Sequence, residues 1–258
     1  RPIGFVHAGF GPNEAGDGLD CSTGVTQMLM VRPSAESPEL TQALLHASED
    51  YLRSRGAKVL YGGGMHPLDP FYLGLYGGSE LSGVLGSDER LNEVFQQSDY
   101  DVAARAIVLH LELARLKPIV SREVRTLRRD IVFNQNFAPQ EDCWWDTVQL
   151  GEFERQEFTL TSKKSPDALA RVQFWDIEPL ASSWGIRTSG ITDLGVAPEH
   201  RRKKLATYLL TESFKVMRKR GVSIVEAHAM QENEPALNLY RSLGFTQVDA
   251  GTVYRKRG

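Results

Sequence analysis

Apolar residues recur at helical spacing in two stretches of the chain that look alike. In the later stretch they follow one another every three to four residues, at Ala206, Leu210, Phe214 and Met217, with Gly221 where a C-terminal cap is expected. In the earlier stretch the same pattern is formed by Leu40, Leu44, Ala47 and Tyr51, with Gly56 as the cap. A short apolar segment follows each stretch, at residues 57–61 and 222–229. The pattern therefore predicts two helices, each leading into a strand.

An internal repeat relates the two stretches. From Pro33 and Pro198 onward, an offset of 165 residues aligns 28 positions without a gap, and eight of them are identical. Before the prolines, Gly24–Thr26 matches Gly190–Thr192 at an offset of 166, so we expect the first strand to carry one extra residue as a β-bulge. Each half then runs strand, helix, parallel strand, which gives a right-handed βαβ unit. The sequence thus predicts an α/β protein with a mixed sheet, built from a duplicated unit.

The two halves diverge after their second strand. The later half continues directly into Asn233–Phe245, a predicted helix that ends at a glycine, and then into a final strand, Val248–Arg255. An offset of 145 pairs this helix with Asp88–Tyr100 and this strand with Ala104–Leu113. The segment left over, Gly62–Leu81, is rich in glycine and aromatic residues, and we predict that it forms an inserted loop or arm.

A second alignment is open for this region, in which Pro70 and Tyr76 match the closing helix of the later half. We prefer the first alignment because it also provides the earlier half with a terminal strand. It predicts two tandem domains, residues 1–113 and 114–258, with the linker Ala114–Pro118 at the start of the second.

The second domain has leading elements that the first one lacks. They are a predicted helix at Ser121–Asp130 and an antiparallel pair of strands, Phe153–Thr161 and Ala168–Trp175, around the turn Lys163–Asp167. The first domain starts at Pro2–Phe10, the counterpart of the second of these strands. We therefore expect the first domain to be incomplete on its N-terminal side.

Composition narrows the class of protein. The 258 residues are 41% hydrophobic, which suits a folded core, and 30 Lys+Arg against 33 Asp+Glu give a net charge of −3, which argues against a broadly basic nucleic-acid binder. No apolar run reaches the ~18–20 residues of a membrane span. Two cysteines and no ligand-spaced His/Cys cluster argue against a disulfide framework and a metal site, and favour a cytoplasmic protein.

The strongest local chemical signal is the run Arg201–Lys204 at the predicted start of a helix. The helix macrodipole disfavours positive charge there, so the run indicates a bound anion. Backbone N–H groups of a helix start together with Arg and Lys side chains are suited to a diphosphate. A solvated charged turn and a nucleic-acid contact are the alternative interpretations.

This segment, Arg201-Arg202-Lys203-Lys204-Leu205-Ala206, resembles the cofactor motif of the GNAT superfamily of N-acyltransferases, which reads Arg/Gln-x-x-Gly-x-Gly/Ala after a strand. The later residues Asn233, Tyr240 and Gly244-Phe245 match the family's closing helix. The resemblance covers Phe158–Arg255 well and Pro2–Leu113 in degenerate form. It implies two tandem GNAT-like domains, an arrangement known in the family from mycothiol synthase.

The resemblance also implies roles for individual residues. The backbone of Leu194, Gly195 and Val196 would pair with the pantetheine arm of acetyl-CoA, and Asn233 would contact the cofactor near its thioester. Tyr240 would protonate the departing thiolate; its alternative role is that of a packed aromatic residue. The pyrophosphate would be held by the loop and the helix start, which comprise Arg201, Arg202, Lys203, Lys204, Leu205, Ala206 and Thr207. The family's glycine is Lys204 here, so the resemblance implies either an added phosphate donor or a weakened site.

The acceptor amine must lose a proton before it attacks a thioester, so a base within reach is useful. In many members of the family this base lies five residues before the asparagine, which is the position of His228. Glu226 lies on the same strand face and is the other candidate, with Asp193 as a third. The alternative is a structural strand histidine beside a solvated glutamate.

The first half departs from the motif throughout. Its counterpart of the cationic run is Glu36–Thr41, with two carboxylates and a proline, and Phe95 takes the place of Tyr240. We therefore expect this half to be inactive and to serve as a scaffold or as part of the acceptor pocket, through the aromatic arm Phe71–Tyr76.

The resulting prediction is an N-acetyltransferase with its active site in the C-terminal half. Acetyl-CoA is the expected acyl donor, a small-molecule or peptide amine is the acceptor, and no metal, nucleic acid or membrane takes part. Two alternatives stay open: a non-catalytic acyl-CoA-binding or regulatory module, and an RNA- or DNA-contacting protein that uses the cationic run.

Overall fold

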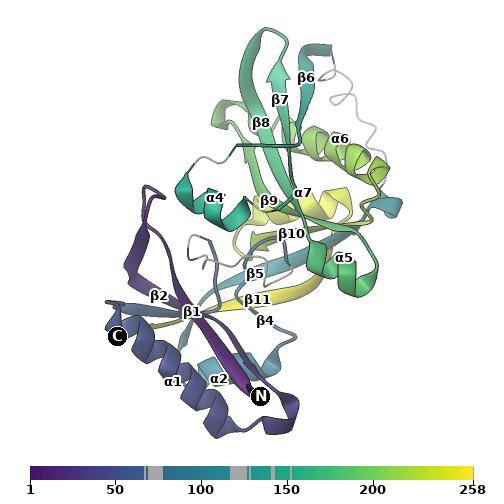
Figure 1. Ribbon diagram of the computed structural model, residues 1–258. Coiled ribbons are helices and arrows are strands. Elements are labelled where there is room, and N and C mark those ends of the chain that lie inside the picture. Colours follow the sequence, from purple (N-terminus) through teal and green to yellow (C-terminus); the bar gives the residue numbers. More distant parts are fainter. Residues whose placement is uncertain are drawn as a thin grey trace.

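The computed structural model describes residues 1–66, 68, 78–116, 127, 129–140, 143–151 and 153–257. These residues form one sheet with the strand order β1-β2-β3-β11-β5-β10-β9-β8-β7-β6, in which the short β4 pairs with β11 (Figure 1). The elements of the first half are β1 Gly4–Pro12, β2 Leu19–Val31, α1 Pro38–Ser54, β3 Val59–Gly62, β4 Val84–Leu85, α2 Glu89–Gln96 and β5 Asp101–Glu112.

The second half follows a short 3-10 turn at Leu113–Arg115. Its elements are β6 Ile131–Asn136, α4 Trp144–Leu150, β7 Arg155–Ser162, β8 Ser165–Asp176, α5 Glu178–Trp184, β9 Thr188–Val196, α6 Leu205–Lys219, β10 Ile224–Met230, α7 Glu234–Leu243 and β11 Thr246–Arg257. The predicted strand pair of this half is confirmed as β7 and β8. The predicted arm Phe71–Tyr76 and most of the predicted helix Ser121–Asp130 lie outside the described residues.

The duplicated βαβ units are confirmed. In each half a helix, α1 or α6, connects two parallel neighbours, β2 with β3 and β9 with β10. The predicted extra residue in the first strand is wrong, because both strands carry a bulge at the same place. The antiparallel ladders skip Gln27 in β2 and Thr192 in β9, which are 165 residues apart. The tripeptide match at an offset of 166 was a coincidence of Gly and Thr, whereas the ladder keeps one register throughout.

The closing helices confirm the offset of 145. Asp88 and Asn233 occupy the N-cap of α2 and α7, and each accepts a hydrogen bond from the backbone N–H three residues later. Phe95 and Tyr240 each pack on the aromatic ring five residues further along, at centroid distances of 5.0 and 5.1 Å. The two helices are therefore equivalent elements of the repeat.

The terminal strands are exchanged between the halves. β5, the last strand of the first half, lies between β10 and β11, and β11, the last strand of the second half, lies between β3 and β5. The cores follow this exchange: Leu109 and Leu111 of β5 are buried with β9, β10 and α6, whereas Tyr254 of β11 is buried with Leu52 and Phe95 of the first half. The sheet is thus continuous across the boundary predicted at residue 113.

Among the described residues, no helix combines the length and the apolar character that spanning a bilayer requires.

Candidate active site

The strands β9 and β10 run side by side at their start and then separate. Their parallel ladder ends with the pair Gly190 and Glu226. β9 stays paired with β8 as far as Val196, so only one of its edges is in a ladder along Leu194–Val196. The other edge turns its backbone groups toward the gap between β9 and β10. Such an edge can add an extended chain as a further strand.

From this end of β9 the chain continues through the 3-10 turn Pro198–His200 to the N-terminal end of α6. Lys204 is the N-cap residue, its side chain makes no capping hydrogen bond, and the helix begins with the bond from Tyr208 N–H to the carbonyl of Lys204. The N–H groups of Leu205–Thr207 therefore have no acceptor within the helix. In contrast, α1, α2 and α7 are capped by the side chains of Ser37, Asp88 and Asn233. An uncapped helix start is suited to an anion.

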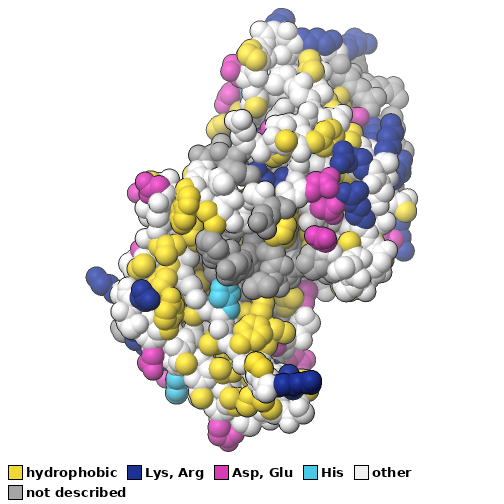
Figure 2. All heavy atoms as spheres, viewed as in Figure 1, with side chains coloured by type: hydrophobic (Ala, Val, Ile, Leu, Met, Phe, Trp, Pro, Cys, Tyr) yellow, Lys and Arg dark blue, Asp and Glu magenta, His cyan; other side chains and the backbone are white. Residues whose placement is uncertain are grey.

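The cationic run shapes the loop before this helix. Lys204, at the position of the family's glycine, has φ 61°, and Arg202 has φ 60°. This left-handed backbone costs roughly 1–2 kcal/mol for a residue with a side chain. Arg201 Nε donates to the carbonyl of Val196 and Lys203 Nζ to that of Glu199. All four cations are exposed, and Figure 2 shows Lys and Arg gathered on the side where Figure 1 draws α6.

Glu226 on β10 is a buried carboxylate, with 6% of its side chain exposed. Its Oε2 lies 2.8 Å from Nε2 of His110 on β5, and its Oε1 lies 2.9 Å from Nε2 of His228 on the same strand. Oε1 also accepts a bond of 2.6 Å from the backbone N–H of Ser79. The sequence-based expectation that Glu226 and His228 share a strand face is therefore confirmed.

These partners keep Glu226 ionised. Burial acts to raise its pKa, but the bonds to His110 and His228, the charge of His228 and the Ser79 amide outweigh burial and lower the pKa to about 2. An ionised carboxylate only accepts hydrogen bonds, so both histidines must donate from Nε2. Whenever its ring is neutral, His228 therefore carries its lone pair on Nδ1.

Three buried polar atoms near this carboxylate have no hydrogen-bond partner among the described residues: Nδ1 of His228, Oγ of Ser79 and Nε1 of Trp175. Ser79 and Trp175 lie close together beside Gly190, because a Cβ atom at Gly190 would lie 2.4 Å from Cβ of Ser79 and 2.9 Å from Nε1 of Trp175. Buried polar groups are normally paired, so these atoms mark a place where a polar ligand or water fits.

Tyr240 lies on α7 and is almost fully buried, with 4% exposed. Burial raises its pKa, and the negative charges of Glu80 and Asp193 raise it further. The hydroxyl is thus protonated at neutral pH, as a proton donor must be.

The remaining predicted residues have other contacts. Asp193, the third candidate base, is 2.8 Å from Nη2 of Arg171 in an ion pair. The side chain of Asn233 accepts from the N–H of Ala236 as the cap of α7. Asn233 therefore has a structural role at the start of α7.

Sequence reasoning missed His110 and the segment Gly78–Glu80. His110 reaches the site because β5 pairs with β10, and strand exchange between halves leaves no local signal in the sequence. The segment reaches it from the inserted loop: a Cβ at Gly78 would lie 3.2 Å from Oε1 of Glu226 and 3.5 Å from Cε1 of His228. The glycine at this position was the available signal, since it permits close approach.

The first half retains a cleft at the counterpart of this site, with a volume of about 430 Å³. Ser37 caps α1 there, and Glu36 forms an ion pair with Arg90. Phe95, the counterpart of Tyr240, is fully buried against Tyr254. The start of α1 at this cleft is thus capped, and the phenylalanine in place of Tyr240 has no hydroxyl to donate a proton.

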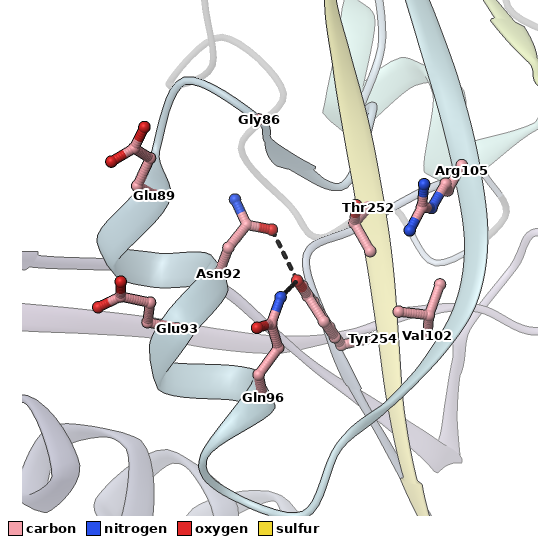
Figure 3. Close-up of a pocket in the computed structure, with 9 residues that line it drawn as sticks. All are labelled: Gly86, Glu89, Asn92, Glu93, Gln96, Val102, Arg105, Thr252 and Tyr254. Atoms are coloured by element: carbon pink, nitrogen blue, oxygen red, sulfur yellow. Dashed lines mark hydrogen bonds between the residues drawn. The ribbon is translucent and has the colours of Figure 1, made fainter.

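Another hollow, of about 290 Å³, lies between α2, β5 and β11 (Figure 3). Its polar groups bond to one another: the Tyr254 hydroxyl donates to Asn92 Oδ1 at 2.7 Å and accepts from Gln96 Nε2 at 3.0 Å. It shares no residue with the Glu226 site. Within the described residues, no three His, Cys, Asp or Glu side chains are arranged to hold a metal ion.

Comparison with known proteins gives a family for the second half. Residues 124–245 match the model of the acetyltransferase (GNAT) family. A stretch of 61 residues is 36% identical to a mycothiol acetyltransferase of Arthrobacter sp. (strain FB24). This match spans 24% of the chain and only 19% of that protein's length.

Solved structures share the fold over most of the chain. A tandem GNAT protein from the clavulanic acid biosynthesis pathway has a TM-score of 0.67 at 13% identity, covering 93% of this chain and 76% of its own. A GCN5-related glucosamine N-acetyltransferase region of a fungal multi-domain β-N-acetylglucosaminidase has a TM-score of 0.70 at 17% identity, covering 98% of this chain and 31% of its own. The predicted fold, a mixed α/β sheet shared with tandem GNAT proteins, is confirmed.

Proposed function

We propose that this chain, which belongs to the GNAT family through the acyltransferase domain at residues 124–245, transfers an acetyl group from acetyl-CoA to an amine in its C-terminal half. The observation that carries the proposal is the unpaired edge of β9 at Leu194–Val196, followed along the chain by the uncapped, cation-rich start of α6. A ligand that carries a diphosphate at one end and an extended, amide-containing arm at the other fits this arrangement.

The described residues fit acetyl-CoA at each part of that arrangement. The backbone edge of Leu194–Val196 would pair with the pantetheine arm. The N–H groups of Leu205–Thr207 and the side chains of Arg201–Lys204 would hold the pyrophosphate. Asn233, at the start of α7, would contact the molecule near its thioester. When bound, acetyl-CoA supplies the acetyl thioester that the acceptor attacks.

His228 is the general base of this proposal. Glu226 holds its Nε2–H, which leaves Nδ1 as the proton acceptor, and Nδ1 is a buried atom with no partner among the described residues. Glu226 is not the base, because its oxygens accept three hydrogen bonds and its pKa lies at about 2. Its charge instead stabilises the imidazolium that His228 becomes, as a triad carboxylate does.

Tyr240 is the proton donor of this proposal. The amine loses one proton to Nδ1 of His228 as the new C–N bond forms, and the Tyr240 hydroxyl gives one proton to the sulfur as the C–S bond breaks. Its raised pKa keeps this proton in place until the basic thiolate develops. Positioning of the two reactants contributes most of the rate.

The first half and the cellular setting belong to the same proposal. We assign residues 1–113 to a degenerate GNAT-like domain and residues 114–258 to the working domain, joined through the exchanged strands. The acceptor is a small-molecule or peptide amine. Both cysteines, Cys21 and Cys143, are free thiols, which suits a reducing cytoplasm.

The test is release of CoA from acetyl-CoA in the presence of glucosamine, spermidine, lysine or a tripeptide. With whichever amine gives turnover, we expect Tyr240→Phe and His228→Gln each to lower kcat at least 10-fold with little change in KM for acetyl-CoA. Phe95 shows that phenylalanine fits this position of the fold. Wild-type kcat in both variants would contradict the assignment.

A further inference from the structure

Two of the three groups that hold Glu226 come from the first half of the chain. They are the N–H of Ser79 and Nε2 of His110, which lie 147 and 116 residues away in sequence. His110 stands directly opposite Glu226 in the antiparallel register of β5 and β10. Opposed residues of such a pair have Cβ atoms about 4.5–5.5 Å apart, so the side chains meet without distortion.

We propose that His110 is a positioning residue for acetyl transfer: it holds Oε2 of Glu226, so that Oε1 stays fixed on Nε2 of His228 and Nδ1 of His228 stays turned to the acceptor amine. This inference rests on the proposed function of the site. His110 acts only through Glu226 and touches none of the reacting atoms.

The physical reason is the freedom of a carboxylate that is held on one side only. The last torsion of a glutamate is broad, so a single bond on Oε1 does not fix the plane of the group. With Oε2 bound to His110 and Oε1 bound to His228 and Ser79, the plane is fixed at both ends. A base displaced by about 1 Å can cost 100-fold in rate, so this fixation matters for turnover.

The burial of Glu226 also makes the bond from His110 to its Oε2 necessary. Glu226 is 6% exposed and His228 is 5% exposed, whereas His110 is 18% exposed. Among the described residues, the groups bonded to the carboxylate are His110 from β5, His228 from β10 and the N–H of Ser79 from the inserted loop. Without His110, one oxygen of a buried charge would lack a donor, and the group would turn or take up a proton.

The first half therefore completes the active site of the second. Its own cleft has lost the cationic loop and the tyrosine, but its last strand and its inserted loop carry groups that the second half does not have. This accounts for a duplicated unit that has lost its own chemistry and still forms one sheet with its neighbour.

The experiment compares His110→Leu with His110→Gln, whose amide N–H can still donate to Glu226. The carboxyl titration of Glu226 is followed by ¹³C NMR, assigned with Glu226→Gln, and turnover is measured with acetyl-CoA and the most reactive amine of the panel above. For His110→Leu we expect a fall of 10- to 100-fold in kcat, an unchanged KM for acetyl-CoA, and a Glu226 pKa that rises above the wild-type value. For His110→Gln we expect most of the rate and the low pKa to return.

A Glu226 titration and a kcat that are unchanged in His110→Leu would overturn the inference. So would loss of rate in both variants alike with an unchanged titration, because that indicates a general structural effect. If His110→Leu fails to fold, His110→Asn, whose amide is too short to reach, replaces it in the same comparison. The titration needs no acceptor, so a wild-type protein without turnover overturns the proposed function separately.

Discussion

Glu226 should make the stability of this protein depend on pH in a way that one substitution removes. Its pKa is lowered from 4.5 to about 2 by partners that exist only in the folded state. A lowered carboxyl pKa stabilises the fold fully above the unfolded value, and the stabilisation is lost as pH falls toward the folded value. The difference corresponds to roughly 3 kcal/mol at neutral pH, of which about 2 kcal/mol is lost by pH 3.

The assay is urea unfolding of the wild type and of Glu226→Gln at pH 7, 5, 4 and 3, followed by the fluorescence of buried Trp145 and Trp175. We expect Glu226→Gln to be less stable at pH 7 by roughly 3 kcal/mol or more, since its amide also meets two N–H donors. The difference in the free energy of unfolding between the two proteins should narrow below pH 4.5. The comparison cancels carboxylates that both proteins share, such as Glu49. A difference in the free energy of unfolding as large at pH 3 as at pH 7 would refute the assignment of an ionised Glu226 bonded at both oxygens.

Three further substitutions test other parts of the site. Gly78→Ala places a carbon 3.2 Å from Oε1 of Glu226, so kcat should fall several-fold in steady-state kinetics with unchanged KM for acetyl-CoA, and an unaffected kcat would argue against the close approach. Lys204→Gly relieves a left-handed backbone, so urea unfolding should show a gain of up to about 1 kcal/mol, and a loss would contradict the strain. Asn233→Asp keeps the cap of α7, whereas Asn233→Ala removes it and should lower the free energy of unfolding by about 1 kcal/mol. The proposed contact of Asn233 with the cofactor predicts weaker acetyl-CoA binding in both variants, measured by calorimetry. Unchanged binding in the Asp variant would exclude the contact.

The local elements could be predicted because their signals lie within a few residues. Helical spacing, capping residues and terminal glycines predicted α1, α6 and α7, and the offset of 145 identified α2 as the counterpart of α7 in the repeat. The same spacing placed Glu226 and His228 on one face of a strand. These features depend on period and on neighbouring residues, which a sequence shows directly.

The pairing of the strands could not be predicted in the same way. The sequence indicated that residues 104–113 and 248–255 form strands, but not that each would lie against the other half of the chain. Pairing depends on which edges meet in space, and two duplicated halves offer near-identical edges. The sequence therefore provided no indication of a role for His110, although it contacts the carboxylate at the centre of the candidate site.

The choice between His228 and Glu226 as base also required the structure. By residue type alone both were candidates. The structure shows that the two are bonded to each other and that the oxygens of Glu226 are occupied, which leaves Nδ1 of His228 as the atom able to take a proton. The proposed roles thus rest on the contacts of these side chains, within β10 and across to β5, rather than on residue type alone.

The central claim is that the loop before α6 binds the diphosphate of acetyl-CoA, and calorimetric titration of acetyl-CoA tests it most directly. We expect micromolar binding to the wild type and a loss of about 100-fold or more in Lys203→Glu/Lys204→Glu. Arg218→Glu/Lys219→Glu, the same charge change about 21 Å away at the other end of the helix, should bind as the wild type does. Equal binding by all three proteins, or none by the wild type, would contradict the account.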